Sequence, residues 1–284
     1  MPERSPNDDM LHAMQLTTIV DIPKSDFEIL PGDTMLFVGS CFADNMGKRF
    51  IDDCFRATVN PYGVMYNPVS VRHTIGQCPV SARVAVITLG TNHVYRLRST
   101  GEVVDNCRKM PHALFSEEKL DIDECTDHLR QCIDTLTDKR GTEHVILTVS
   151  PIRYAKYGYH ESRLSKAVLL LAADRMVREK PLSVSYFPAY EIMNDELRDY
   201  RFYRPDMLHP TGQAADYIHQ RFEETYFAPE TREFLQRWKP IKAALAHRPF
   251  DPSSADFLRF REQTRAKIQA LQEAYPQITF HFNH

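Results

Sequence analysis

Short apolar runs recur along the chain, and each is long enough for a strand but too short for a membrane span. Their continuous apolar character is typical of strands buried on both faces of a parallel sheet. The predicted strands occupy residues 34–39, 83–89, 144–149 and 183–187.

Between these runs the apolar residues are spaced for helices. Phe42, Met46 and Phe50 recur every four residues and would share one helix face. Residues 116–139, with Ser116 as the N-cap, and residues 165–177 predict two further helices. Strands that alternate with helices imply right-handed crossovers, so we expect an α/β fold around a doubly wound parallel sheet.

Past Tyr226 the pattern changes to two helices with no strand between them, at 229–247 and 253–275. We expect these two helices to cover the sheet. The alternative is that they form a homodimer surface. The expected organisation has three parts: a polar tail at 1–13, an α/β domain at 14–227 and a C-terminal helical extension at 228–284.

Composition narrows the class of protein. With 43% apolar and 26% charged residues the chain is globular rather than disordered. Lys plus Arg is 35 and Asp plus Glu is 38, and the net charge of −3 argues against binding to nucleic acid or anionic lipid by bulk charge. The N-terminus lacks the basic and apolar regions of a secretory signal. None of the six cysteines forms a CxxC pair, which disfavours a zinc site and favours reduced thiols, so we expect a cytoplasmic protein without a membrane span.

The first predicted strand ends at Gly39-Ser40, where a helix begins at once. A serine there lies in the positive field of the helix N-terminus, and the exposed N–H groups could hold an oxyanion. Serine is also a favoured N-cap, so a purely structural role is the alternative. Cys41 would be acidified in the first helical turn and could itself attack an ester. We expect Cys41 to be buried as a small apolar residue and favour Ser40 as the nucleophile.

A serine hydroxyl needs a base, and imidazole titrates in the right range. His209 is the candidate base, and Asp206, three residues earlier, could fix its tautomer. The alternative is that Asp206 caps a local turn and His209 is a surface residue. Glu191 and Glu196 lie upstream and compete for the place of the carboxylate.

The third candidate, Asn92, follows the second predicted strand. Its amide could donate to the same oxyanion, although asparagine is equally common in turns. Because the carboxyl ends of parallel strands meet at one edge of a sheet, we expect Ser40, Asn92, Ser150 and Tyr190 to gather there.

These pieces, in this order, resemble the SGNH hydrolase superfamily and most closely its GSCFA family, whose name residues 39–43 spell. The resemblance extends from about residue 14 to 227. The other segments that resemble the family are NPYGVMYNP (60–68), TLGTNHVYR (88–96), NCRKMP (106–111), TVSPIR (148–153) and the stretch from Tyr186 to Pro210.

The resemblance implies a three-layer α/β/α, flavodoxin-like sandwich with a parallel sheet. It implies that Ser40 is the nucleophile, that His209 is the base and that Asp206 orients this base. In the superfamily the oxyanion is held by the serine N–H, a glycine and an asparagine. Gly63 and Asn92 are the matching positions here.

Two departures qualify this match. His93 stands where many superfamily members have an aspartate, and relatives in the GSCFA branch often lack an asparagine at position 92. Asn106 and Asn67 are therefore the reserve candidates for the oxyanion amide.

The resulting prediction is a serine-dependent ester hydrolase or O-acyltransferase that acts on an acylated carbohydrate or small metabolite, without cofactor or metal. Arg153 or Lys166 could bind a substrate carboxylate or phosphate, with an ion pair as the structural alternative. The rival functions are a phosphate- or nucleotide-binding module and a non-catalytic scaffold on the same fold. The absence of a G-x-G-x-x-G or Walker sequence disfavours nucleotide binding.

Overall fold

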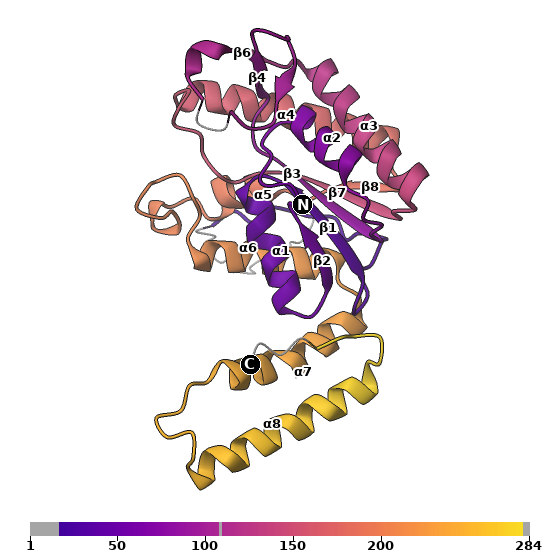
Figure 1. The fold of residues 1–284 in the computed structure, drawn as a ribbon, viewed down its shortest axis with the longest axis vertical. Helices are drawn as coiled ribbons and strands as arrows, with labels where there is room; N and C mark the ends of the chain where they lie inside the picture. The colour runs from indigo at the N-terminus through magenta and orange to yellow at the C-terminus, as the bar shows by residue number, and fades with distance from the viewer. Residues whose placement is uncertain (1–16, 108–109, 281–284) are drawn as a thin grey trace, which may run out of the picture.

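The computed structural model describes residues 17–107 and 110–280, so the tail expected at 1–13 lies outside the described residues. Five parallel strands form the central sheet, in the order β2-β1-β3-β7-β8 (Figure 1). They are β1 (Thr34–Gly39), β2 (Arg56–Val59), β3 (Val84–Leu89), β7 (His144–Val149) and β8 (Val184–Tyr186). Numbered within the sheet this order is 2-1-3-4-5, the flavodoxin-like arrangement, and the predicted fold class is confirmed.

Side chains of each inner strand alternate between two apolar layers, as strand geometry requires. Met35 and Phe37 face one layer, and Leu36 and Val38 face the other. The first layer is closed by α1 (Cys41–Asp52) and α6 (Gly212–Tyr226). The second is closed by α2 (Pro68–Gln77), α3 (Ile122–Arg140) and α4 (Tyr159–Glu179), which lie together above the sheet in Figure 1.

The helix predicted to begin at Ser116 is wrong at its start. Phe115–Lys119 forms strand β6, and α3 begins only after Asp121. The Asp121 side chain accepts the Glu124 N–H at 2.8 Å, and the Glu124 carboxylate accepts the Asp121 N–H at 2.8 Å. This reciprocal capping box satisfies two otherwise unpaired donors, which Ser116 could not do from within a strand.

Strand β6 belongs to a small antiparallel sheet that the sequence analysis did not predict. Its order is β5-β4-β6, with β4 at His93–Leu97 and β5 at Val103–Val104, and a 3-10 turn, η1 (His112–Leu114), precedes β6. The insertion follows β3 directly along the chain and therefore begins at the carboxyl edge of the main sheet. Three short elements later in the chain complete the fold: α5 (Ala189–Glu191), η2 (Ile192–Glu196) and η3 (Tyr200–Phe202).

The two C-terminal helices are confirmed as α7 (Pro229–Ala246) and α8 (Ala255–Ala274), which form a hairpin below the α/β layers in Figure 1. In α7 the Trp238 indole N–H donates to the Asp52 carbonyl at 3.0 Å, and the Thr231 hydroxyl donates to the Ile29 carbonyl at 2.7 Å. Asp52 ends α1 and Ile29 precedes β1, so the extension docks at the amino edge of the sheet, where Phe234, Leu235 and Trp238 join the buried cluster of the first apolar layer. A homodimer surface on these helices stays a prediction.

Within the described residues, no helix combines the length and the apolar character that crossing a bilayer requires.

Candidate active site at the carboxyl edge of the sheet

Ser40 is held tightly where β1 ends and α1 begins. Its Oγ accepts the Phe42 N–H at 3.2 Å and lies 3.1 Å from the Thr88 hydroxyl oxygen, and its own N–H donates to the Thr88 carbonyl at 3.0 Å. Ser40 is 1% exposed. These bonds tie β1 to β3, the pair of strands at which the strand order reverses and where ligands of open α/β sheets bind.

The backbone before Ser40 has a conformation at Gly39 that other residues rarely adopt, and side-chain hydrogen bonds hold it in place. Gly39 has φ 140°, and a Cβ at this position would lie 2.0 Å from the Thr88 carbonyl oxygen. The Gly39 N–H donates to the Asn60 side-chain oxygen at 2.8 Å, while the Asn60 amide nitrogen donates to Asp44 on α1 at 2.6 Å. The junction is therefore pre-organised by three segments of the chain.

The expectation of a buried Cys41 is wrong. Cys41 is partly exposed, and its Sγ lies 3.4 Å from the Tyr66 hydroxyl oxygen. Successive side chains of a helix point about 100° apart, and here it is Ser40 that packs against Thr88 on the sheet. The side chain with access to solvent at this junction is therefore the thiol.

Asp206 and His209 form a well-oriented pair. One Asp206 oxygen lies 2.7 Å from His209 Nδ1, and the other accepts the N–H groups of His209 and Leu208 at 3.0 and 2.9 Å. These two N–H groups, followed by the imidazole, lower the pKa of Asp206 to about 2. With Nδ1–H donating to a carboxylate, Nε2 carries the lone pair that a general base needs.

The rival carboxylates are engaged elsewhere. Glu191 accepts the Tyr186 hydroxyl at 2.9 Å, and Glu196 pairs with Arg221 at 2.7 Å. Of the three carboxylates considered from the sequence, Asp206 is the one beside His209.

The described residues show no hydrogen bond between the His209 ring and either Ser40 or Cys41. The loop after β7 connects the two halves of the candidate site. Its Arg153 N–H donates to the Leu208 carbonyl at 3.1 Å, on the His209 side. On the other side of the loop lies Tyr154, the next residue, which packs near Cys41 through Tyr66.

The Tyr154 ring packs edge-on against the Tyr66 ring, with the ring centroids 5.9 Å apart. Tyr66 in turn contacts Cys41. The loop therefore has the imidazole segment on one side and the thiol on the other.

The predicted oxyanion donors are not brought together. The Gly63 N–H donates to the Asn60 carbonyl at 2.8 Å, in a turn where Gly63 has φ 95°. Asn92 is buried, and its amide nitrogen donates to the Leu120 carbonyl at 2.6 Å. Together with the Ser40 N–H, each of these donors already serves an acceptor within the fold.

The two reserve asparagines line one cavity. Asn67 and Asn106 both belong to the walls of a cavity of about 230 Å³ between the segment before α2, the β4-β5-β6 insertion and the loop after β7. Its walls also include Tyr66, Tyr154 and Tyr157. The Asn67 side-chain oxygen caps α2 by accepting the Ser70 N–H at 2.9 Å, an arrangement that fixes the amide at the cavity wall.

Lys166 is not a surface ligand, because it is 2% exposed. Its ammonium nitrogen donates to the carbonyls of Gly90 and Ser150, both at 2.8 Å, and lies 5.8 Å from the centre of the Tyr190 ring. Burial lowers the pKa of Lys166 to about 7. Two of the four residues expected at the carboxyl edge, Ser150 and Tyr190, thus contact a lysine that joins the ends of β3 and β7. Sequence reasoning missed this interior role because lysine is rarely buried without a carboxylate.

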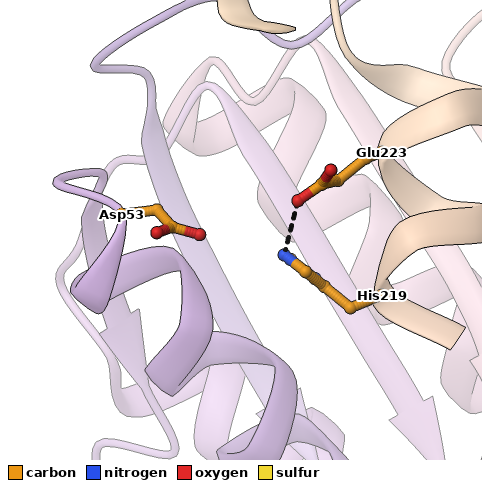
Figure 2. Close-up of side chains that lie close together, drawn as sticks. All are labelled: Asp53, His219 and Glu223. Atoms are coloured by element: carbon orange, nitrogen blue, oxygen red, sulfur yellow. Dashed lines mark ion pairs between the residues drawn. The ribbon is translucent and has the colours of Figure 1, made fainter. Parts of the chain in front are cut away.

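One cluster outside this edge has the residue types of a metal site. Asp53, His219 and Glu223 place their ligand atoms within 4.8 Å of one another, and Figure 2 shows His219 and Glu223 side by side on α6 with Asp53 facing them. Two ammonium groups already balance the carboxylates: Lys242 donates to Asp53 at 2.9 Å, and Lys239 lies 3.7 Å from Glu223. The cluster therefore has the charge balance of an ion-pair network that joins α1, α6 and α7.

Comparison with known proteins identifies two matching families. The model described as the GSCFA family matches residues 34–79 and 77–222, and that described as the GSCFA domain protein, C-terminal domain, matches residues 238–283. No curated protein sequence matches the chain.

Similar solved structures are distant in sequence. A catalytic mutant of Axe2, an acetylxylan esterase from Geobacillus stearothermophilus, is 12% identical with a TM-score of 0.47, over 70% of this chain and 96% of that one. A GDSL-like lipase from Bacteroides thetaiotaomicron is 14% identical with a TM-score of 0.44, over 68% and 87%. A carbohydrate esterase family 3 protein from Talaromyces cellulolyticus is 8% identical with a TM-score of 0.40, over 73% and 99%.

Proposed function

The chain belongs to the GSCFA family, and we propose that it hydrolyses or transfers acyl esters with a nucleophile at the β1–α1 junction. The observation that carries this proposal is the Asp206–His209 pair, in which a carboxylate fixes the imidazole tautomer at 2.7 Å. A carboxylate-oriented imidazole and a nucleophile at the point where the strand order reverses are two components that such acyl transfer requires.

The proposed reaction has two halves. The nucleophile attacks the ester carbonyl while His209 Nε2 removes its proton, which gives a tetrahedral oxyanion. The imidazolium, stabilised by Asp206, then returns the proton to the departing alcohol and leaves an acyl-enzyme. Water, or an acceptor alcohol, attacks this acyl group with the same proton transfers in reverse and restores the free enzyme.

Ser40 and Cys41 compete for the role of nucleophile. Ser40 is the residue that the resemblance indicates, but it would have to give up its Thr88 contact to reach a substrate. Cys41 is partly exposed and lies at the start of α1. Access favours Cys41, with Ser40 holding the junction in place.

We propose that the oxyanion is held by the Cys41 backbone N–H at the start of α1, with an amide from Asn67 or Asn106. Gly63 and Asn92 stay predictions that would need a rearranged site. The tyrosine walls of the 230 Å³ cavity suit the flat faces of a sugar ring, which supports an acylated carbohydrate as the substrate class.

The described cysteines are all free, which agrees with a reducing compartment and supports a cytoplasmic location.

The test is ester hydrolysis by the purified protein with 4-nitrophenyl acetate and acetylated monosaccharides as substrates. We expect turnover that falls about 10³-fold in His209→Gln. Between the two nucleophile variants, Cys41→Ala should remove activity while Ser40→Ala should retain part of it. Full activity in Cys41→Ala with none in a folded Ser40→Ala would assign the role to Ser40. Undiminished turnover in both His209→Gln and the Ser40→Ala Cys41→Ala double variant would contradict the proposal.

A further inference from the structure

Three arginines line a second cavity, of about 280 Å³, beside the His209 segment. Arg153 comes from the loop after β7, Arg163 from α4 and Arg198 from the segment between η2 and η3. Asn194, Tyr200 and Tyr203 supply other parts of the wall. Elements far apart in the sequence therefore bring three guanidinium groups to one opening.

The charges of these arginines are not balanced by neighbouring carboxylates. Within the described part of the chain, none of the three forms an ion pair, and the Arg153 guanidinium donates to the Met207 carbonyl at 3.1 Å. Asp199 is the one carboxylate of the lining, and it accepts the backbone N–H of Arg201 at 2.8 Å. The cavity thus has an excess of positive charge.

Several other arginines of the same protein do have carboxylate partners. Arg49 pairs with Asp216, Arg83 with both Asp33 and Glu143. Three neighbouring guanidinium groups without such partners repel one another, and an anion between them would remove that repulsion. Planar guanidinium groups bind carboxylate or phosphate oxygens with paired hydrogen bonds.

The cavity and the Asp206–His209 pair share the same stretch of backbone. Arg153 donates to the Met207 carbonyl through its side chain and to the Leu208 carbonyl through its N–H, immediately before His209. The Arg153 guanidinium is also stacked over the Tyr159 ring at 4.2 Å, a contact that fixes its position. A ligand held by Arg153 would therefore lie next to the imidazole segment.

We infer that this cavity binds an anionic group, a carboxylate or a phosphate, carried by the ester substrate at a distance from the bond that is cleaved. The inference rests on the proposed esterase function and adds a substrate class to it: acidic rather than neutral esters. Arg163 and Arg198 act as binding residues, and Arg153 additionally ties the anion site to the His209 loop.

The kinetic test compares a neutral and an anionic ester of the same alcohol, 4-nitrophenyl acetate and 4-nitrophenyl hemisuccinate. In the native protein the anionic ester should have the higher kcat/KM. In Arg163→Gln and Arg198→Gln the ratio of anionic to neutral kcat/KM should fall about tenfold or more, mainly through KM. The control is Arg265→Gln, an exposed α8 position, which should keep the native ratio. A ratio that is unchanged in both cavity variants would overturn the inference.

A binding test does not depend on turnover. Calorimetric titration with inorganic phosphate and, separately, with succinate should give saturable binding that weakens in the Arg163→Gln Arg198→Gln double variant and persists in His209→Gln. Tighter binding of one ligand identifies phosphate or carboxylate as the preferred group. Binding without any ester turnover would refute the proposed function while keeping the anion site. Turnover of the neutral ester with no binding of either anion would refute the anion site alone.

Discussion

The carboxylate of Asp206 lies 2.7 Å from Nδ1 of His209, and its second oxygen accepts two backbone N–H groups from the same turn. The turn thereby holds the carboxylate ionised and the imidazole in one tautomer. An imidazole oriented in this way can accept a proton at Nε2, which is the role that the proposed acyl transfer gives it.

Replacing Asp206 by Asn should lower kcat/KM by about 10²- to 10⁴-fold, because an amide no longer favours the productive imidazole tautomer. Thermal stability should change much less, since the pair is exposed. Steady-state kinetics with 4-nitrophenyl acetate measures the effect. The control is Asp195→Asn, an exposed residue upstream, and equal losses in the two variants would contradict the assignment.

Replacing Gly39 by Ala should unfold or strongly destabilise the protein, by about 3 kcal/mol or more. The new Cβ would lie 2.0 Å from the Thr88 carbonyl oxygen at φ 140°, in a conformation that non-glycine residues rarely adopt. Gly76→Ala is the matched control: it lies in α2 with open space around the added methyl, so it should stabilise the protein by about 0.5–1 kcal/mol. Urea unfolding of both variants measures the difference, and equal stabilities would show that the junction is not as constrained as described.

Lys166 predicts how stability depends on pH. Its pKa is about 7 in the folded protein and near the usual 10.5 when unfolded, so between these values the unfolded chain binds the extra proton. Stability should therefore rise with pH across this window, by up to about 1.4 kcal/mol per pH unit. Urea unfolding at pH 7, 8 and 9 should show this slope in the native protein relative to Lys166→Met, and parallel profiles would contradict a buried, depressed lysine.

Removing the Trp238 side chain should detach much of the C-terminal extension from the amino edge of the sheet. Trp238 is 4% exposed and donates to the Asp52 carbonyl, so Trp238→Ala should cost about 3–5 kcal/mol of stability. Phe250→Ala, at a fully exposed position, should change it by less than about 0.5 kcal/mol. Since the extension docks opposite the candidate site, kcat of the folded fraction should remain near native in Trp238→Ala.

The sequence predicts the central strands well because β1, β3 and β7 are buried on both faces, which leaves a continuous apolar run. It fails at β2, where RATV is mostly half-buried, and at β6, where FSEEK is largely exposed, because neither segment forms a continuous apolar run. The pairing of β6 with β4 brings together residues about 20 positions apart, which local spacing cannot reveal.

In the candidate site, too, the contacts between neighbouring residues could be predicted and those between distant segments could not. The Asp206–His209 contact is local, at a spacing of three residues, and could be inferred from the sequence. The burial of Ser40 depends on Thr88, 48 residues away on another strand, so the sequence offered no reason to prefer Cys41 as the accessible side chain. Likewise, the shared cavity of Arg163 and Arg198 exists only because α4 and the η2–η3 segment meet in the fold.

In the proposed mechanism the β1–α1 junction holds a nucleophile that His209 activates. The most direct measurement is intact mass after incubation with a fluorophosphonate probe and, in parallel, with iodoacetamide at neutral pH, followed by peptide mapping. We expect one adduct within residues 39–43, on Cys41 or Ser40, that forms at least tenfold more slowly in His209→Gln. Equal labelling rates in the native protein and in His209→Gln, or no adduct at this junction on folded protein, would contradict the account.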